Sequence, residues 1–195
     1  MNTDNKDIDI RVYKKLTPLL DKQIRDLKKL APNFNNTEIK PGEIEKHLDK
    51  FCSKRDVKSW ILVFNKDKLL ASLAVFKRKI KHNNNYILLG GVGGLRVRQD
   101  VRRQGIATKM MILAMQTLDD LNCDIAYLCA NPSSFLALFY NKYGFVLLKK
   151  PYTFLGKSGK KYFERDGMIA PVNSPNIFQL IIKSQEPFDI GRGNW

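Results

Sequence analysis

The chain has 195 residues, of which 44% are hydrophobic and 27% are charged. Its 34 Lys and Arg residues exceed its 19 Asp and Glu residues, which gives a formal net charge of +15. These values exclude a disordered segment and fit one domain, residues 1–195, with an ordinary hydrophobic core.

The N-terminal part of the chain predicts a strand followed by two helices. Residues 8–13 alternate between apolar and polar side chains, as a half-buried strand does. Leucine and isoleucine then recur at helical spacing over residues 16–30. The polar segment 33–41 is typical of a loop, and residues 42–51 place their apolar side chains on one helical face.

The next part of the chain predicts three strands. Two apolar runs, at 59–64 and 69–78, flank the turn sequence Asn-Lys-Asp-Lys and indicate a β-hairpin. A third strand is expected at 86–97.

Helices and strands alternate in the second half of the chain. We expect a helix at 105–121, a strand at 124–130, a helix at 134–143, a strand at 145–148, and strand and loop from Pro151 onward. This order predicts a single α/β domain whose mixed sheet has helices on both faces. Its core would comprise about residues 8–150, and residues 151–195 would form a strand and loop extension packed onto it.

The positive charge is concentrated in the middle of the chain. Residues 51–110 hold 14 basic and 3 acidic residues, a net charge of +11, whereas residues 1–50 and 111–195 each have a net charge of +2. Such a local excess indicates either a solvated surface or an anionic partner such as nucleic acid, phosphate or acidic lipid.

Cysteine and histidine usage argues against several kinds of site. Cys52, Cys123 and Cys129 show no Cys-x-x-Cys spacing, so neither a disulfide framework nor a zinc site is supported. His47 and His82 lie near no Ser, Cys or carboxylate motif, which disfavours catalytic triads and histidine metal sites. We expect no metal.

The N-terminus and the hydropathy pattern bear on localisation. The N-terminus lacks the cationic start and apolar core of a signal peptide, and no apolar run reaches about 18 residues. We therefore expect a cytoplasmic protein with no membrane partner.

Between residues 95 and 108 a strand runs through a basic turn into a helix. The free N–H groups and the positive dipole end of the first helical turn favour an anion at such a junction. Gly105 and Ala107 leave room for it, and Arg102 and Arg103 can add charge-assisted hydrogen bonds. Neither a Walker motif nor a complete dinucleotide-binding fingerprint is present.

This turn, Arg-x-x-Gly-x-Ala from Arg102, resembles the acetyl-coenzyme A signature of the GCN5-related N-acetyltransferase (GNAT) superfamily. The segment from Asn131 to Phe145, an apolar helix that ends in Tyr-x-x-x-Gly-Phe, resembles a second motif of that superfamily. Together the two motifs span about residues 86–148. The resemblance implies a mostly antiparallel central sheet that splays between the strand before the basic turn and the strand at 124–130.

The resemblance also implies acetyl-CoA as co-substrate. Its pantetheine arm would lie between the splayed strands and its pyrophosphate against the N–H groups of residues 103–108. A backbone N–H near Leu95 to Val97 would stabilise the tetrahedral intermediate. The residues assigned in this way to coenzyme binding are Leu95, Val97, Arg102, Arg103, Gln104, Gly105, Ile106, Ala107, Thr108, Asn131 and Phe139.

Glycines in the splayed strand fit such an approach of the coenzyme. Glycines inside a strand mark a bulge or a close backbone approach. They can also pack small against a neighbouring helix. The four glycines concerned are Gly90, Gly91, Gly93 and Gly94.

Tyr140 matches the tyrosine that protonates the departing thiolate in the superfamily. A phenol with a pKa near 10 suits this role because it stays protonated at neutral pH. The alternative is a core aromatic residue on a helix that also carries Phe135 and Phe139.

The catalytic base is left open. Many members carry a glutamate on the bulged strand, whereas residues 89–94 contain no carboxylate. Glu164, Asp166, Asp189 or ordered water are the alternatives.

Residues 164–172 and 188–195 loosely resemble the aminoglycoside 2'-N-acetyltransferase branch, whose catalytic glutamate would fall at Gly93. In that branch acidic residues and the terminal carboxylate receive the cationic aminosugar. Trp195 can equally be an apolar end packed onto the domain. The resemblance assigns substrate binding to Glu164, Asp166, Asp189 and Trp195.

The favoured function is therefore direct acetyl transfer from acetyl-CoA to a primary amine of a small molecule, aminoglycoside-like by resemblance. The alternatives are an acetyltransferase of a protein amine or aminoacyl-tRNA, and a non-catalytic acetyl-CoA-binding module. Nucleic acid is a less favoured partner than a small molecule, and family members often form homodimers.

Overall fold

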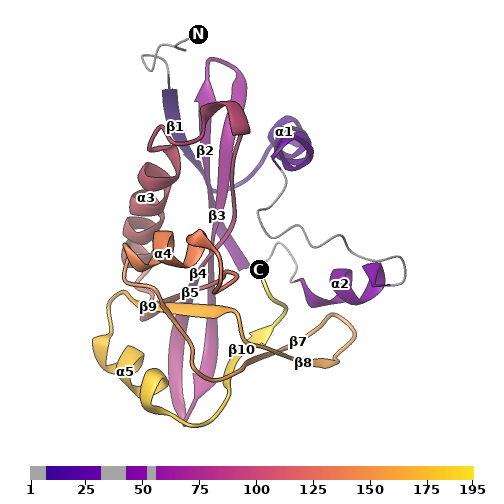
Figure 1. Ribbon diagram of the computed structural model, residues 1–195. Helices are drawn as coiled ribbons and strands as arrows, with labels where there is room; N and C mark the ends of the chain where they lie inside the picture. Colours follow the sequence, from indigo (N-terminus) through magenta and orange to yellow (C-terminus); the bar gives the residue numbers. More distant parts are fainter. Residues whose placement is uncertain (1–7, 32–42, 52–55) are drawn as a thin grey trace.

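The computed structural model describes residues 8–31, 43–51 and 56–195. Within them the main sheet has seven strands, all antiparallel to their neighbours except β4 and β5, which are parallel (Figure 1). Their spatial order is β1 (Ile8–Tyr13), β2 (Val57–Asn65), β3 (Lys68–His82), β4 (Asn85–Val97), β5 (Ile125–Cys129), β9 (Gly167–Pro171) and β6 (Val146–Leu147). The predicted mixed, mostly antiparallel sheet is confirmed.

Helices cover both faces of this sheet, as predicted (Figure 1). Helix α3 (Ile106–Asp120) and helix α4 (Phe135–Asn141) lie on one face. Helix α1 (Pro18–Leu30) lies on the opposite face, on the same side as α2 (Ile44–Lys50). The loop predicted at 33–41 lies outside the described residues.

The sequence explains where α1 begins and which side it buries. The Thr17 hydroxyl caps the helix by accepting a hydrogen bond from the Leu20 N–H at 3.2 Å. Leu20, Ile24 and Leu27 follow at helical spacing, and they pack on β2 and β3.

The tail from Pro151 contributes to two sheets. Strand β9 lies in the main sheet between β5 and β6. A smaller sheet has the order β10 (Phe188–Arg192), β7 (Tyr152–Leu155) and β8 (Lys161–Glu164). The prediction of strand and loop alone is wrong at α5 (Pro175–Lys183), whose start is signalled by Ser174 as N-cap residue and by proline at the first helical position.

Alternation along the strands divides the core between the two faces of the sheet. Val92 and Ala126 point toward α3 and α4, whereas Leu89 and Tyr127 point toward the smaller sheet and α5. Side chains at even and odd positions of β4 and β5 therefore serve opposite faces. No helix within the described residues is long and apolar enough to cross a membrane.

Candidate active site between β4 and β5

Strands β4 and β5 pair over a short stretch and then separate. The parallel register runs from Leu89 opposite Ile125 to Gly91 opposite Tyr127, and no pair follows it among the described residues. The remainder of β4 stays paired with β3. An opening therefore forms between the C-terminal halves of β4 and β5, and the predicted splay is confirmed.

A β-bulge in β4 borders this opening. Ala74 pairs with Gly93 and Ser72 with Arg96, so β4 carries one more residue than β3 between these two pairs. Gly94 has a φ of 64°, in the region that favours glycine, and Leu95 follows it in the bulge. Val97 was also predicted to face the coenzyme, and it pairs with Ala71.

Side chains or backbone from other parts of the fold lie close to Gly90, Gly91 and Gly93. A Cβ at Gly90 would lie 2.6 Å from the Leu118 side chain of α3, so this glycine packs small against the helix. A Cβ at Gly91 would collide with the Trp195 indole, and one at Gly93 would lie 3.2 Å from the backbone carbon of Trp195. Gly90 therefore packs small against a helix, whereas Gly91 and Gly93 are approached by Trp195.

The basic turn after β4 leads directly into α3. Gly105 is the N-cap residue, with a φ of 76° and a ψ of 0°, and Arg103 has a φ of 62°. A Cβ built on Gly105 would meet nothing within 4 Å. The N–H groups that begin α3, from Ile106 to Thr108, have no backbone acceptor within the described residues, and they lie at the positive end of the helix dipole.

The two arginines of this turn differ in their surroundings. Arg102 is half-buried, and its Nε donates a hydrogen bond to the Val97 carbonyl at 3.0 Å, which holds the turn against β4. Arg103 and Gly105 are exposed, and Gln104 is half-buried. The turn thus presents backbone amides and the Arg103 cation together.

Tyr140 lies on α4, on the α3 side of the sheet, and is 8% exposed. Its ring contacts Phe139 and Phe145 edge-on, with centroids 5.3 and 6.1 Å away. Burial raises the pKa of Tyr140 to about 12, and the neighbouring Cys129 adds to this shift. The hydroxyl donates to no group in the part of the chain that the structure describes, so it is available to a substrate.

The loop before α4 is held by its own side chains. The Asn131 side-chain oxygen accepts a hydrogen bond from the Ser133 N–H at 2.9 Å, and the Ser134 hydroxyl donates to the Asn131 carbonyl at 2.7 Å. Ser134 also caps α4 by accepting from Leu136 N–H. Asn131 therefore shapes the loop that positions Tyr140.

Trp195 covers the opposite side of β4. Its indole stacks on Phe76 with centroids 5.0 Å apart, and the Arg78 guanidinium lies 3.9 Å from the ring centroid. Tyr127 meets the indole edge-on at 5.9 Å. The apolar packing expected as one alternative for Trp195 is present, and it lies beside Gly91 and Gly93 of the opening.

A polar cluster lies next to Trp195 at the end of β5. The Tyr127 hydroxyl lies 2.8 Å from the Cys129 sulfur, and the Tyr152 hydroxyl lies 3.3 Å from it. Tyr152 donates to an Asp166 carboxylate oxygen at 2.8 Å, and the Asn194 amide donates to the Tyr152 oxygen at 3.0 Å. Sequence reasoning missed this cluster, apart from Asp166, because its members come from four separate segments: β5, β7, the connection between β8 and β9, and the C-terminal end.

The other predicted acidic residues have cationic partners. Glu164 accepts from Lys50 of α2 at 2.5 Å, and Asp189 lies 3.8 Å from Lys161. Asp189 also accepts from the Gly191 N–H at 2.7 Å. The negative charges of Glu164 and Asp189 are therefore compensated by lysines.

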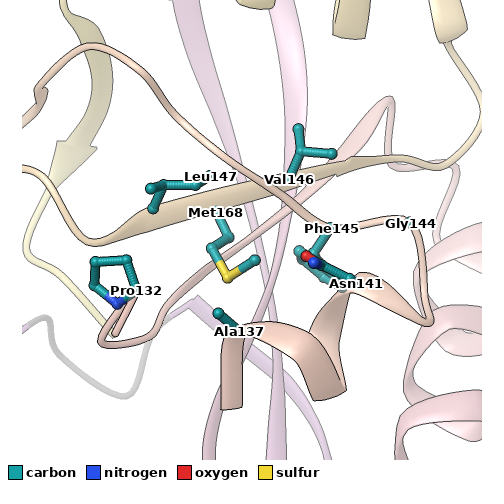
Figure 2. A pocket seen from close by; sticks show the side chains of 8 residues that line it. All are labelled: Pro132, Ala137, Asn141, Gly144, Phe145, Val146, Leu147 and Met168. Carbon is teal, nitrogen blue, oxygen red and sulfur yellow. The ribbon is translucent and has the colours of Figure 1, made fainter. Parts of the chain in front are cut away.

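A separate pocket of about 450 Å³ lies between α4 and the β6–β9 edge (Figure 2). Its lining is mostly apolar and includes none of the predicted site residues. The lining residues are Pro132, Ala137, Asn141, Gly144, Phe145, Val146, Leu147 and Met168. Across the described ranges, His, Cys, Asp and Glu form no group of three that could hold a metal ion.

Together these elements can bind an anion and support acid–base chemistry. The amides at the start of α3 suit a phosphate group. Tyr140 suits proton donation near the end of β5, and the β4 bulge leaves backbone groups outside the β3–β4 pairing.

Comparisons with known proteins agree with this geometry. Residues 13–148 match the family profile described as an acetyltransferase (GNAT) domain. No curated protein matches the chain.

Three solved structures illustrate the similarity of the fold. A probable N-acyltransferase from Enterococcus faecalis is 19% identical, with a TM-score of 0.50. The match covers 72% of this chain but only 33% of the Enterococcus faecalis chain. A GNAT family acetyltransferase from Brucella melitensis, solved in complex with acetyl-CoA, is 14% identical with a TM-score of 0.51, covering 71% and 83% of the two chains. The ribosomal-protein-S18-alanine N-acetyltransferase from Escherichia coli is 12% identical with a TM-score of 0.55, covering 86% and 97%.

Proposed function

The chain belongs to the GNAT acetyltransferase family, and we propose that it transfers the acetyl group of acetyl-CoA directly to a primary amine of a small molecule. The observation that carries this proposal is the opening between β4 and β5. It has the first N–H groups of α3, which have no backbone acceptor within the described residues, at one end and the Tyr140 helix at its side.

The residues around the opening fit the coenzyme. The amides of Ile106 to Thr108 and the Arg103 side chain would bind the pyrophosphate, and the left-handed Gly105 leaves the room that this requires. The separated edges of β4 and β5 would bind the amide groups of the pantetheine arm. The Brucella melitensis neighbour was solved with acetyl-CoA, which supports this choice of co-substrate.

The chemistry needs no covalent intermediate on the protein. Acetyl-CoA supplies an activated thioester. The β4 bulge near Leu95 would donate an N–H to the carbonyl oxygen, and Tyr140 would protonate the leaving sulfur. Because burial raises the pKa of Tyr140 to about 12, the phenol stays protonated at neutral pH.

The acceptor is assigned by chemical class. The tail's resemblance to the aminoglycoside branch favours an aminosugar-like amine. However, Lys50 and Lys161 neutralise Glu164 and Asp189, two of the carboxylates that would bind such an amine. A small primary amine with few positive charges agrees with both observations.

Two measurements test the proposal. Saturating acetyl-CoA should raise the unfolding temperature, because a ligand that binds only the folded state stabilises it. A thiol-release assay over aminoglycosides, spermidine, small monoamines and N-terminal peptides should then give turnover with at least one small amine. An unchanged unfolding temperature would refute coenzyme binding, and turnover with peptides alone would make the protein a peptide acetyltransferase.

A further inference from the structure

Strand β4 has no carboxylate at the opening, and Cys129 of β5 lies on the other side. Gly91 and Tyr127 are the last paired residues, so Gly93 and Cys129, each two residues further on, stand at the same level on either side. Both positions face Trp195. A side chain at Gly93 would meet Phe76 and Trp195. The Cys129 sulfur contacts Tyr127, whose ring packs on Trp195. Cys129 thus lies opposite the place where a β4 glutamate would be.

Hydrogen bonds connect Cys129 with Asp166. The Asn194 amide donates both to the Cys129 sulfur, at 3.2 Å, and to the Tyr152 oxygen, at 3.0 Å. With its oxygen accepting from Asn194, Tyr152 directs its own proton to Asp166 at 2.8 Å. The Asp166 backbone oxygen also accepts from the Ala130 N–H at 2.9 Å, which fixes Asp166 at the end of β5.

Of the three acidic residues predicted to bind the acceptor, Asp166 differs in having no lysine or arginine partner among the described residues. Glu164 is paired with Lys50 and Asp189 lies near Lys161. Within the described part of the chain no Lys or Arg nitrogen lies within 4.0 Å of the Asp166 carboxylate. An incoming ammonium group would therefore meet an unneutralised carboxylate here.

The surroundings of Asp166 suit a group that exchanges protons. Burial raises the pKa of Asp166, the Tyr152 hydrogen bond opposes this, and Glu164 of β8 and Lys50 of α2 act more weakly, in opposite directions. Cys129 on β5 faces the same cluster, and burial raises its pKa to about 12, so the sulfur stays a neutral thiol. Tyr127 and Tyr152 also stay neutral, since burial raises the pKa of each.

We propose that Asp166 accepts the proton of the acceptor amine in place of a β4 glutamate, and that Tyr152 positions its carboxylate. This assignment rests on the proposed acetyltransferase function.

The transfer balances with the groups present. Asp166 takes one proton from the ammonium form of the acceptor, and the neutral nitrogen then bonds to the thioester carbonyl carbon. The carbon–sulfur bond breaks as Tyr140 gives its proton to the sulfur. The nitrogen loses a second proton, which restores Tyr140 through water, and Asp166 returns its proton to solvent. The products are the acetylated amine, free coenzyme A and one proton.

The test compares wild-type protein with Asp166→Asn, using acetyl-CoA and the most active amine of the thiol-release panel. We expect kcat to fall by about 10²-fold, which is the usual contribution of a general base. The dissociation constant for acetyl-CoA should be unchanged. The rate of the variant should rise about tenfold per pH unit below the pKa of the amine, because only the unprotonated amine then reacts.

Asp120→Asn is the matched control, since it makes the same change at an exposed position, at the end of α3 far from the basic turn, and its kcat should stay within about twofold of wild type. A wild-type kcat and pH profile in Asp166→Asn would overturn the assignment of Asp166 and leave the proposed function standing. No thiol release by the wild type with any amine would overturn both. Unaltered binding of acetyl-CoA by Asp166→Asn shows that the variant is folded.

Tyr152→Phe tests the positioning role. Removing this hydrogen bond should raise the pKa of Asp166, so the acid limb of the pH–rate profile should move to higher pH. A lower rate with an unmoved acid limb would mean that Tyr152 is merely structural.

Discussion

At the scale of single residues, Tyr140 is buried, and its hydroxyl has no hydrogen-bond partner among the described residues. We predict that Tyr140→Phe lowers kcat by roughly 10²-fold, the contribution expected of a general acid. The KM for acetyl-CoA should change little, because the ring keeps its contacts with Phe139 and Phe145. Steady-state kinetics with Tyr143→Phe as control, on the same helical end, checks this. Equal turnover in Tyr140→Phe and wild type would remove Tyr140 from the role.

Asp166 should cost the protein stability at neutral pH. Burial raises its pKa in the folded state, so its ionised form is less favourable in the folded than in the unfolded chain. The stability that its protonated form provides is present below the unfolded pKa, near 3.9, and is lost as pH rises through the higher folded value.

Asp166→Asn cannot ionise, so it should unfold at a higher temperature than wild type at pH 7.5. The difference should shrink as the pH is lowered toward about 4. Thermal unfolding across this range checks the prediction, with Glu164→Gln as the control that should give no gain. A lower unfolding temperature for Asp166→Asn at pH 7.5 would contradict it.

The site residues differ in how well the sequence predicts them. Gly105 and Tyr140 stand at fixed positions in short motifs, so local sequence is enough to predict both. Cys129 and Asn194 are 65 positions apart, and their contact depends on how the tail folds back, which no local pattern encodes. The sequence also did not show that Lys50 would neutralise Glu164 from a separate helix.

At the scale of elements, periodicity predicted the described strands and α-helices up to residue 148 to within a few positions, but not the short 3-10 helix at Gln99–Val101. The opening also follows from local sequence, because glycines in β4 permit both the bulge and the approach of Trp195. The tail was harder to predict. The apolar positions of α5 form an almost continuous run over 177–182, which fits a strand and a helix equally well. The insertion of β9 between β5 and β6 is a non-local pairing.

The start of α3 can be tested with two glycines in matched conformations. Gly105 and Gly159 both have positive φ, 76° and 87°, and a Cβ on either would meet nothing within 4 Å. Replacing either by alanine should therefore destabilise the fold similarly, by about 1 to 2 kcal/mol. Gly105→Ala alone should raise the KM for acetyl-CoA, by about tenfold, because its methyl group would enter the space in front of the α3 amides.

Chemical denaturation and coenzyme titration of the two variants separate these effects. Equal KM values for acetyl-CoA in Gly105→Ala and Gly159→Ala would place the anion site elsewhere.

At the scale of the whole molecule, two groups can be distinguished among the described basic residues of 51–110. One group lies around the turn into α3, which includes Arg102 and Arg103. The other lies near the far end of the β3–β4 hairpin, where Arg78 is bound to Asp56 and Trp195, and Lys77 donates to the Leu121 carbonyl. Part of this second group therefore stabilises the fold.

Removing charges from the two groups should affect coenzyme binding differently. Lys79 pairs with Leu88, whereas Ala71 pairs with Val97 next to the turn, so eight residues of β3 separate these two levels. At about 3.4 Å per residue this is roughly 27 Å, well beyond the Debye length of about 8 Å at physiological salt. The charges at Lys79 and Lys81 are therefore screened from a coenzyme at the start of α3.

We predict that Arg103→Gln raises the KM for acetyl-CoA by about tenfold, which corresponds to the loss of one charge-assisted hydrogen bond. It should also make this KM less sensitive to salt, because one phosphate contact is gone. The double variant Lys79→Gln/Lys81→Gln removes twice the charge and should leave KM unchanged at about 0.15 M salt. Titrations from about 0.05 to 0.5 M salt check both. A higher KM in the double variant would mean that net charge, rather than the local geometry at α3, attracts the coenzyme.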